Sequence, residues 1–273
     1  MRVRKIVTHG GNAHMDDMLG VALLAFKYNV PIERKVEIRE FEEETIYVDI
    51  GRRYEPPYLL DHHQSLDIPC SLVLVIRHHF PELANMDIPE ITYIDTRDRF
   101  GLSKVVNYPL PSELLFFERI FTRWFANITY ISPEDEEYYI LKWLGKRFYG
   151  YIRSRYDELK RYEDILRKAD ERVIDGVKIL LLEDDLPPYE VLNRRSDVHV
   201  IIQPSSRNPK QFSIIKLAPY QDKITLDGVA EYLSKKGKLV FYHANKFMLV
   251  AADRDSAIES IKYIKMVDDS NEV

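Results

Sequence analysis

Histidine and aspartate residues are concentrated in the first hundred positions, where several of them come directly after short apolar runs. The candidate metal ligands are His9, His14, Asp16, Asp49, His62 and Asp95. Bringing several carboxylates together is unfavourable unless a cation offsets their mutual repulsion. Neutral imidazoles and carboxylates without a thiolate suit Mn²⁺, Mg²⁺, Co²⁺ or Zn²⁺, and these candidates are too many for one tetrahedral ion. The residue types therefore predict two divalent cations that share a bridging carboxylate.

A pair of cations at one site is suited to hydrolysis of a phosphate ester. It orients water in line with phosphorus and neutralises the charge that develops on the phosphoryl oxygens. Each of these residues taken alone could instead be a cap, a turn former or a surface group, which is the commoner role of a single His or Asp after a strand. The combination is what favours hydrolysis of a phosphoester or phosphoanhydride.

The first hundred residues alternate β-branched apolar runs with helical patterns, which is typical of an α/β fold with a mostly parallel sheet and helices on both faces. We predict strands at 5–8, 35–41, 45–50, 58–60 and 91–94, and helices at 16–28 and 71–80. Ligands bind at the carboxyl ends of the strands in such sheets. Residues that follow different strands, such as His9, Asp49 and Asp95, are therefore expected to meet at one edge.

The rest of the chain divides into a helical stretch and a second α/β pattern. Helical periodicity from 112 to about 171 predicts a connector, and strand patterns return after Gly176. We predict a metal-binding catalytic domain at 1–110, a helical connector at 111–172 and a smaller substrate-binding α/β domain at 173–273. In the last domain we expect strands at 177–182, 198–202, 212–217, 239–242 and 247–251, and a final helix at 256–264.

Composition excludes several classes of protein. The chain is 45% apolar, which is enough for a substantial core, and its net charge of −5 argues against a generic binder of polyanions. The single cysteine, Cys70, cannot form an intramolecular disulfide, so we expect a reducing, cytoplasmic location. No apolar run approaches the ~20 residues of a membrane span, so we expect no membrane partner.

Four segments, in this order, resemble the motifs of the DHH phosphoesterase superfamily. They are 8–17 (THGGNAHMDD), 47–51 (YVDIG), 61–64 (DHHQ) and 94–98 (IDTRD). Within that superfamily the chain is most similar to the Myg-type family, the melanocyte-proliferating-gene exonucleases described as metal-dependent hydrolases. A looser likeness continues at 240–247 (VFYHANKF) and 254–258 (RDSAI), so the resemblance extends over most of the chain.

The resemblance also implies roles for individual residues. One cation would be held by His9, His14 and Asp49, and the other by Asp16, Asp49, His62 and Asp95. His63 would donate a hydrogen bond to the scissile phosphate, and Asp61 would orient the histidines. Where the family has D-x-x-D-N-G, this chain has Asp95-Thr-Arg-Asp98-Arg, so either aspartate could be the ligand. We favour Asp95 because it directly follows a predicted strand.

The activity that the resemblance implies is manganese-dependent exonucleolytic cleavage of RNA or short single-stranded nucleic acid, in a cleft between the two domains. A phosphatase or pyrophosphatase acting on small molecules is the nearest alternative, and a non-catalytic module that binds nucleic acid or protein is another. The candidate substrate contacts are Arg207, His243 and Asp98. Arg207 lies in a polar turn that could hold a phosphate or could simply be solvated.

The connector interleaves basic and aromatic residues, from Lys142 to Tyr156, without an intervening acid. Such a pattern occurs in proteins that bind single-stranded nucleic acid. An amphipathic helix that packs its rings into the core also explains the pattern, and we favour that interpretation.

Overall fold

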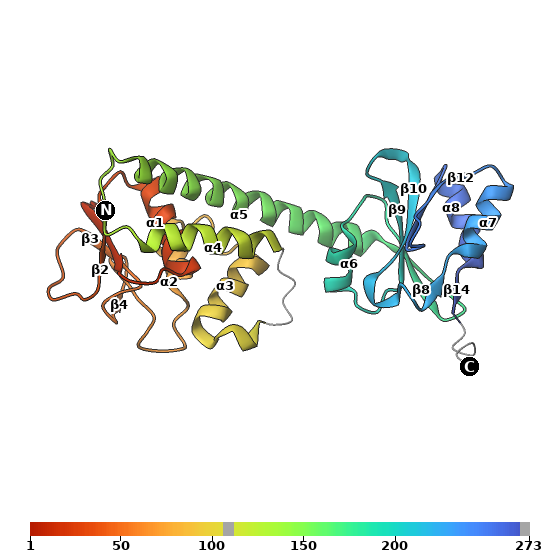
Figure 1. Cartoon of the computed structure of the whole chain (residues 1–273). Helices are drawn as coiled ribbons and strands as arrows, with labels where there is room; N and C mark the ends of the chain where they lie inside the picture. The colour runs from red at the N-terminus through yellow and green to blue at the C-terminus, as the bar shows by residue number, and fades with distance from the viewer. Residues whose placement is uncertain (106–111, 268–273) are drawn as a thin grey trace. The chain divides into compact units, whose positions relative to one another are not determined.

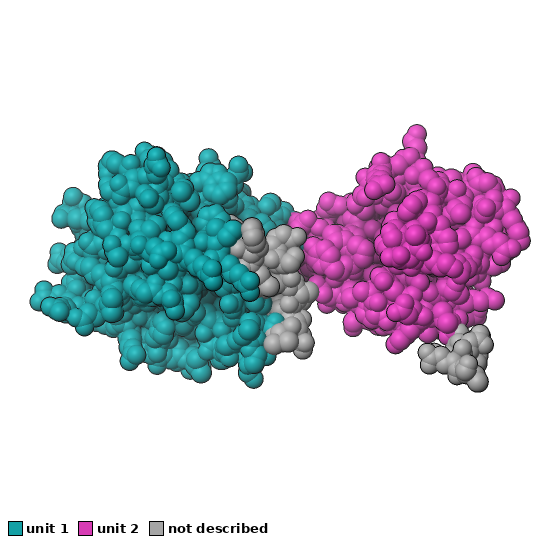
Figure 2. Space-filling model, viewed as in Figure 1, with its two compact units in different colours: residues 1–157 teal, residues 158–273 magenta. Residues whose placement is uncertain are grey.

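The computed structural model describes residues 1–105 and 112–267, with side chains described in these ranges except at 112–117 (Figure 1). The chain forms two compact units, residues 1–157 and 158–273 (Figure 2). The predicted boundaries at 110 and 172 stay a prediction. None of the helices in the described ranges combines the length and the apolar character that crossing a bilayer requires.

The first unit is built on a six-stranded sheet. Its strands are β1 (Lys5–His9), β2 (Ile32–Lys35), β3 (Thr45–Val48), β4 (Tyr54–Glu55), β5 (Leu59–Leu60) and β6 (Tyr130–Ile131). Their order is β4-β5-β3-β1-β2-β6. The four central strands are parallel, and β4 and β6 are antiparallel edge strands. The predicted mostly parallel sheet is therefore confirmed.

Helices flank this sheet (Figure 1). They are α1 (Met15–Lys27), α2 (Ser71–His79), α3 (Pro89–Phe100), α4 (Ser112–Ala126) and α5 (Glu136–Lys168), with a short 3₁₀ helix at Leu102–Lys104. Helix α1 is buried from Met15 to Ala25. Helix α5 passes directly over it, since a Cβ atom on Gly145 would lie 1.9 Å from the carbonyl oxygen of Ala22. Glycine is thus required where these two helices touch.

Two of the predicted strands are wrong. Residues 91–94 lie inside α3, because Pro89 occupies the first turn of that helix and Gly101, with φ of 82°, ends it. These two signals outweigh the β-branched run between them. The predicted strand at 35–41 lies earlier, at β2, because its partner β1 ends where His9 pairs with Lys35.

The long basic and aromatic stretch of α5 is only partly packed. Leu141, Leu144 and Ile152 are buried, whereas Trp143 and Tyr151 are exposed. The predicted packing of the rings into the core is therefore wrong for these two side chains.

The second unit is a smaller α/β fold. Its strands are β7 (Asp170–Ile174), β8 (Val177–Leu181), β9 (Val200–Ser205), β10 (Asn208–Lys216), β11 (Ile224–Thr225), β12 (Leu239–Tyr242), β13 (Met248–Ala251) and β14 (Lys265–Met266). Its helices are α6 (Pro188–Arg194), α7 (Asp227–Lys235) and α8 (Arg254–Ser260), with 3₁₀ helices at Ala218–Tyr220 and Ile261–Tyr263. The main sheet has the order β12-β13-β10-β9-β8-β7, and β11 pairs with β14. Only β8 and β9 are parallel neighbours within the main sheet.

Candidate metal centre

The register of the first sheet places three predicted site residues side by side. Thr8 pairs with Val48, and Val48 pairs with Leu60, so these three residues form one row across β1, β3 and β5. The next position on each strand is His9, Asp49 and Asp61. Because the three strands are parallel, their carboxyl ends lie at the same edge and deliver these side chains to one place.

Helix α1 brings two more predicted ligands to this edge. His14 is its N-cap, and Asp16 and Asp17 lie in its first turn, where the helix dipole favours negative charge. The Asp17 carboxylate accepts a hydrogen bond from the His14 backbone N–H at 2.6 Å. Asp16 is 1% exposed, and neither of its carboxylate oxygens has a hydrogen-bond partner in the described structure.

Asp49 lies at the centre of the cluster. Its Oδ2 is 3.3 Å from Nε2 of His9, and its Oδ1 is 3.2 Å from Nε2 of His62. The hydroxyl of Ser71, the first residue of α2, donates to Oδ1 at 2.8 Å. Asp49 has a left-handed backbone with φ of 58°, which costs a non-glycine residue of the order of 1 kcal/mol. The fold thus accepts local strain at the residue that contacts both histidines.

Asp61 holds the segment that follows β5. One of its oxygens accepts hydrogen bonds from the backbone N–H of His63 at 2.9 Å and from Nδ1 of His63 at 2.8 Å. The other accepts from the backbone N–H of Arg52 at 2.7 Å. Asp61 is buried, while the His63 side chain is 51% exposed. The carboxylate therefore fixes a half-exposed imidazole through its Nδ1 atom.

The two aspartates of the fourth motif have different surroundings. Asp95 accepts from the backbone N–H of Cys70 at 2.7 Å and pairs with Arg99 one turn further along α3. Asp98, by contrast, has its Oδ2 2.9 Å from Nε2 of His62. The expectation that Asp95 follows a strand is wrong, because both residues lie within α3. The helix turns Asp98 toward the cluster and ties Asp95 to the start of α2.

The donor atoms of the cluster form three overlapping groups that could each hold a cation. These groups are His9 with His14 and Asp49, Asp49 with His62 and His63, and His14 with Asp16 and Asp98. Within each group the candidate ligand atoms lie within 4.8 Å of one another. Nε2 of His9, Nε2 of His62 and Oδ2 of Asp98 are buried within 2.9–3.3 Å of an oppositely charged group, yet none of them makes a hydrogen bond of good geometry in the described structure. Buried polar atoms normally have a partner, so these atoms and the Asp16 carboxylate fit a divalent cation.

The electrostatics of the cluster point in the same direction. Burial, and then the charges of Asp49 and Asp98, raise the pKa of Asp16 well above its usual value. Burial opposes the charged form of the two histidines, yet the neighbouring carboxylates raise the pKa of His9 to about 9 and that of His62 to about 10. These shifts have one cause in common, which is the concentration of negative charge in one buried space. A bound cation would offset that charge.

Three contributors to the site were not identified from the sequence. Asp17 is fully buried, with Oδ2 3.3 Å from Nε2 of His9 and 3.6 Å from Nη2 of Arg34. Arg34 is held in turn by the carbonyl oxygen of Phe125 at 2.9 Å. Ser71 is the third, through its bond to Asp49. Asp17 stands within the first motif, so its position was a signal, whereas Arg34 and Ser71 reach the site only through tertiary packing.

Two predicted substrate contacts belong to the second unit. Arg207 lies in the exposed turn between β9 and β10. His243 follows β12, where its Nδ1 accepts from the backbone N–H of Asn245 at 3.1 Å and its ring lies 4.3 Å from that of Phe247. Neither residue belongs to the cluster, and their predicted role in substrate binding stays a prediction.

Comparison with known proteins supports the N-terminal assignment. Residues 5–66 match the model of the MYG1_exonuc family, which is described as an uncharacterised protein family (UPF0160). The match contains β1, β3 and β5 and the site residues that follow them, and it ends before α2 and α3. A search of curated proteins found no match.

Proposed function

We propose that the chain is a divalent-metal-dependent phosphoesterase that hydrolyses phosphodiester bonds of RNA or short single-stranded nucleic acid, with exonuclease action. The observation that carries the proposal is the set of buried carboxylate and imidazole atoms that meet at one sheet edge, several of them without a hydrogen bond. The match to a family whose name refers to an exonuclease supports the same class of reaction.

Two cations, with Mn²⁺ as our first choice, would be held by the overlapping ligand groups, with Asp49 shared between them. His9, His14 and Asp49 form one set, and Asp16, His62 and Asp98 complete the other around Asp49. Divalent cations in such a site make water a better nucleophile and neutralise charge on phosphoryl oxygens. Asp98 replaces Asp95 in this proposal because the Asp95 carboxylate is already engaged by Cys70 and Arg99.

The protein's own side chains would bind and orient the phosphate. His63 is half-exposed beside Asp49, with its Nδ1 fixed by Asp61. This hydrogen bond raises the pKa of His63 and so favours the ring with both nitrogens protonated. In that state Nε2 donates to a phosphoryl oxygen or to the leaving oxygen, while Asp61 keeps the ring in position.

The test compares hydrolysis of a short labelled RNA, inorganic pyrophosphate and a nucleoside bisphosphate, each with Mn²⁺. We expect stepwise shortening of the RNA that stops when a chelator removes the metal. Asp49→Asn should reduce turnover by about 1,000-fold or more, because one substitution weakens both ligand sets. Turnover of the small substrates alone would overturn the nuclease assignment in favour of a phosphatase.

A matched control separates a catalytic effect from misfolding. Glu40→Gln changes an exposed carboxylate in the loop between β2 and β3, outside the cluster, and it should leave turnover unchanged. Metal content is measured on both variants. If the parent protein binds metal and RNA but hydrolyses none of the three substrates, the chain is a binding module and the proposal is wrong.

A further inference from the structure

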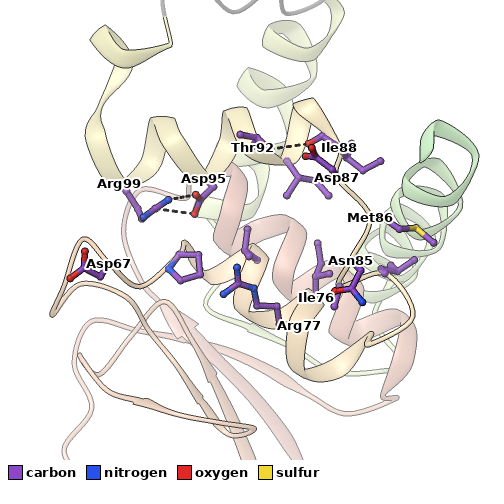
Figure 3. A pocket seen from close by; sticks show the side chains of 15 residues that line it. Asp67, Ile76, Arg77, Asn85, Met86, Asp87, Ile88, Thr92, Asp95 and Arg99 are labelled. Carbon is purple, nitrogen blue, oxygen red and sulfur yellow. Dashed lines mark hydrogen bonds and ion pairs between the residues drawn. The ribbon is translucent and has the colours of Figure 1, made fainter. Parts of the chain in front are cut away.

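The first unit also contains a pocket that lies apart from the candidate metal centre. It is a pocket of about 420 Å³ between α2, α3 and the segment that joins them (Figure 3). Its apolar wall consists of Val73, Ile76, Leu83, Met86, Ile88 and Ile91. The volume falls within the roughly 300–1,000 Å³ that is usual for small-molecule sites. No residue of the three metal-binding groups lines it.

The charged residues of this pocket differ in how they are paired. Asp95 and Arg99 neutralise each other across one turn of α3. The guanidinium of Arg77 extends from α2 into the pocket (Figure 3), and within the described ranges no hydrogen bond or ion pair engages it. Asp67 and Asp87 also line the pocket, and no described side chain pairs with their carboxylates. The pocket therefore presents one available cation and two available carboxylates beside an apolar wall.

We propose that this pocket binds a small zwitterion with an apolar side chain, which is the chemistry of a free apolar amino acid. Arg77 would hold the carboxylate through paired N–H donors, as guanidinium groups do. Asp67 or Asp87 would accept from the ammonium group, and the side chain would pack on Ile76 and Ile91. The same two carboxylates repel a dianion, so a nucleoside monophosphate does not fit this arrangement of charge.

The pocket is joined to the metal centre by the Asp95–Arg99 pair. Asp95 accepts from the backbone N–H of Cys70, whose neighbour Ser71 donates to Asp49. Arg99 donates to the carbonyl oxygen of Leu66 at 2.7 Å, in the loop that follows the two cluster histidines. A ligand that packs against this pair therefore steadies the segments that position Asp49. This coupling rests on the proposed function, whereas binding in the pocket does not.

The binding test uses calorimetry on the full chain with L-phenylalanine and L-leucine. Phenylacetate lacks the ammonium group and phenethylamine lacks the carboxylate, so each removes one predicted contact. We expect both amino acids to bind, and each analogue to bind at least about tenfold more weakly than L-phenylalanine or not at all. Failure of both amino acids at millimolar concentration would overturn the proposal. So would equal binding of phenylacetate, or tighter binding of adenosine monophosphate.

Variants locate the site. Arg77→Gln should weaken amino-acid binding at least about tenfold while leaving the melting temperature unchanged, because Arg77 is exposed. Arg39→Gln is the matched control, since Arg39 is an exposed arginine that pairs with Glu37 outside the pocket. Equal loss in both variants, or no loss in Arg77→Gln, would place the ligand elsewhere. Because binding is measured without hydrolysis, a failure here is distinguishable from a failure of the phosphoesterase assignment.

Discussion

Buried polar groups in the two units of this protein are treated in opposite ways. In the second unit, the amide of buried Gln203 exchanges hydrogen bonds with both the N–H and the carbonyl of Leu186 at 3.0 Å. The ammonium of buried Lys216 donates to the carbonyl oxygens of Gln221 and Ile224. Throughout the described ranges, every buried side-chain polar atom without a hydrogen-bond partner belongs to the first unit.

This difference separates groups that stabilise a fold from groups that serve a ligand. A buried polar atom that is bonded within the protein costs little and can contribute to stability, whereas an unbonded one costs about 1–3 kcal/mol. Most of the unbonded atoms of the first unit, including those of Asp16 and His62, gather at the metal centre. The described part of the second unit therefore satisfies its buried polar side chains internally, whereas the first leaves a group of them that a cation could satisfy.

The largest difference in effect is expected between two aspartates of α3. Asp98→Asn should lower turnover of the RNA substrate by about 100-fold or more, because it removes a charge that faces the cation site, and it should not lower the melting temperature. Asp95→Asn should instead reduce stability by about 1–2 kcal/mol, because it weakens the pair with Arg99. Turnover assays and urea melts on both variants check this. Reversed effects would show that Asp95 is the ligand and that unpartnered atoms do not mark the site.

From the sequence, only those residues of the candidate metal centre that follow a strand could be placed. His9, Asp49 and Asp61 each follow an apolar run that really is a strand, so the edge rule places them correctly. The reason for favouring Asp95 over Asp98 was wrong, because four β-branched or aromatic residues at 91–94 resemble a strand although Pro89 and Gly101 bound a helix.

Other parts of the fold were out of reach for a different reason. Arg34 is positioned by the carbonyl oxygen of Phe125, 91 residues away, and no local pattern reports such a contact. Helices α6 and α7 were also not predicted; α6 is only seven residues long, too short for a clear helical period. The predictions that held rest on local periodicity and on the common direction of parallel strands.

The next test removes a buried, hydrogen-bonded ammonium group from the second unit. Lys216→Met should lower the free energy of unfolding by about 2 kcal/mol, because two buried carbonyl oxygens lose a charged donor. Metal binding, which belongs to the first unit, should be unchanged. Lys210→Met is the control, since Lys210 is exposed, and it should change stability by less than about 0.5 kcal/mol. Urea unfolding of both variants, followed with metal titration, measures the two effects. Loss of metal binding in Lys216→Met would contradict the division between the units.

The smallest expected effect on stability concerns a histidine of the first unit whose two ring nitrogens are both hydrogen-bonded. His79 is buried at the end of α2, with Nε2 2.9 Å from the carbonyl oxygen of Pro57 and Nδ1 3.1 Å from the hydroxyl of Tyr28. Burial, opposed by the bond to Pro57 and aided by the charge of Lys27, lowers the pKa of His79 to about 4. Unlike the cluster histidines, His79 is thus held neutral by the fold.

This difference has a defined dependence on pH. The pKa of His79 is lower in the folded protein than its unfolded value of about 6.5. His79 therefore does not change the free energy of unfolding above pH 6.5, and it lowers that free energy as the pH drops from 6.5 toward 4. At pH 5.5 the loss is about 1.4 kcal/mol relative to neutral pH.

His79→Gln should flatten the fall in unfolding free energy between pH 7.5 and 5.5 by about this amount. His78→Gln, which alters the neighbouring ring bonded to Tyr54, should retain most of it. Urea melts at the two pH values in a chelating buffer give both slopes. An unchanged slope in His79→Gln would mean that His79 is protonated in the fold, like the histidines of the cluster.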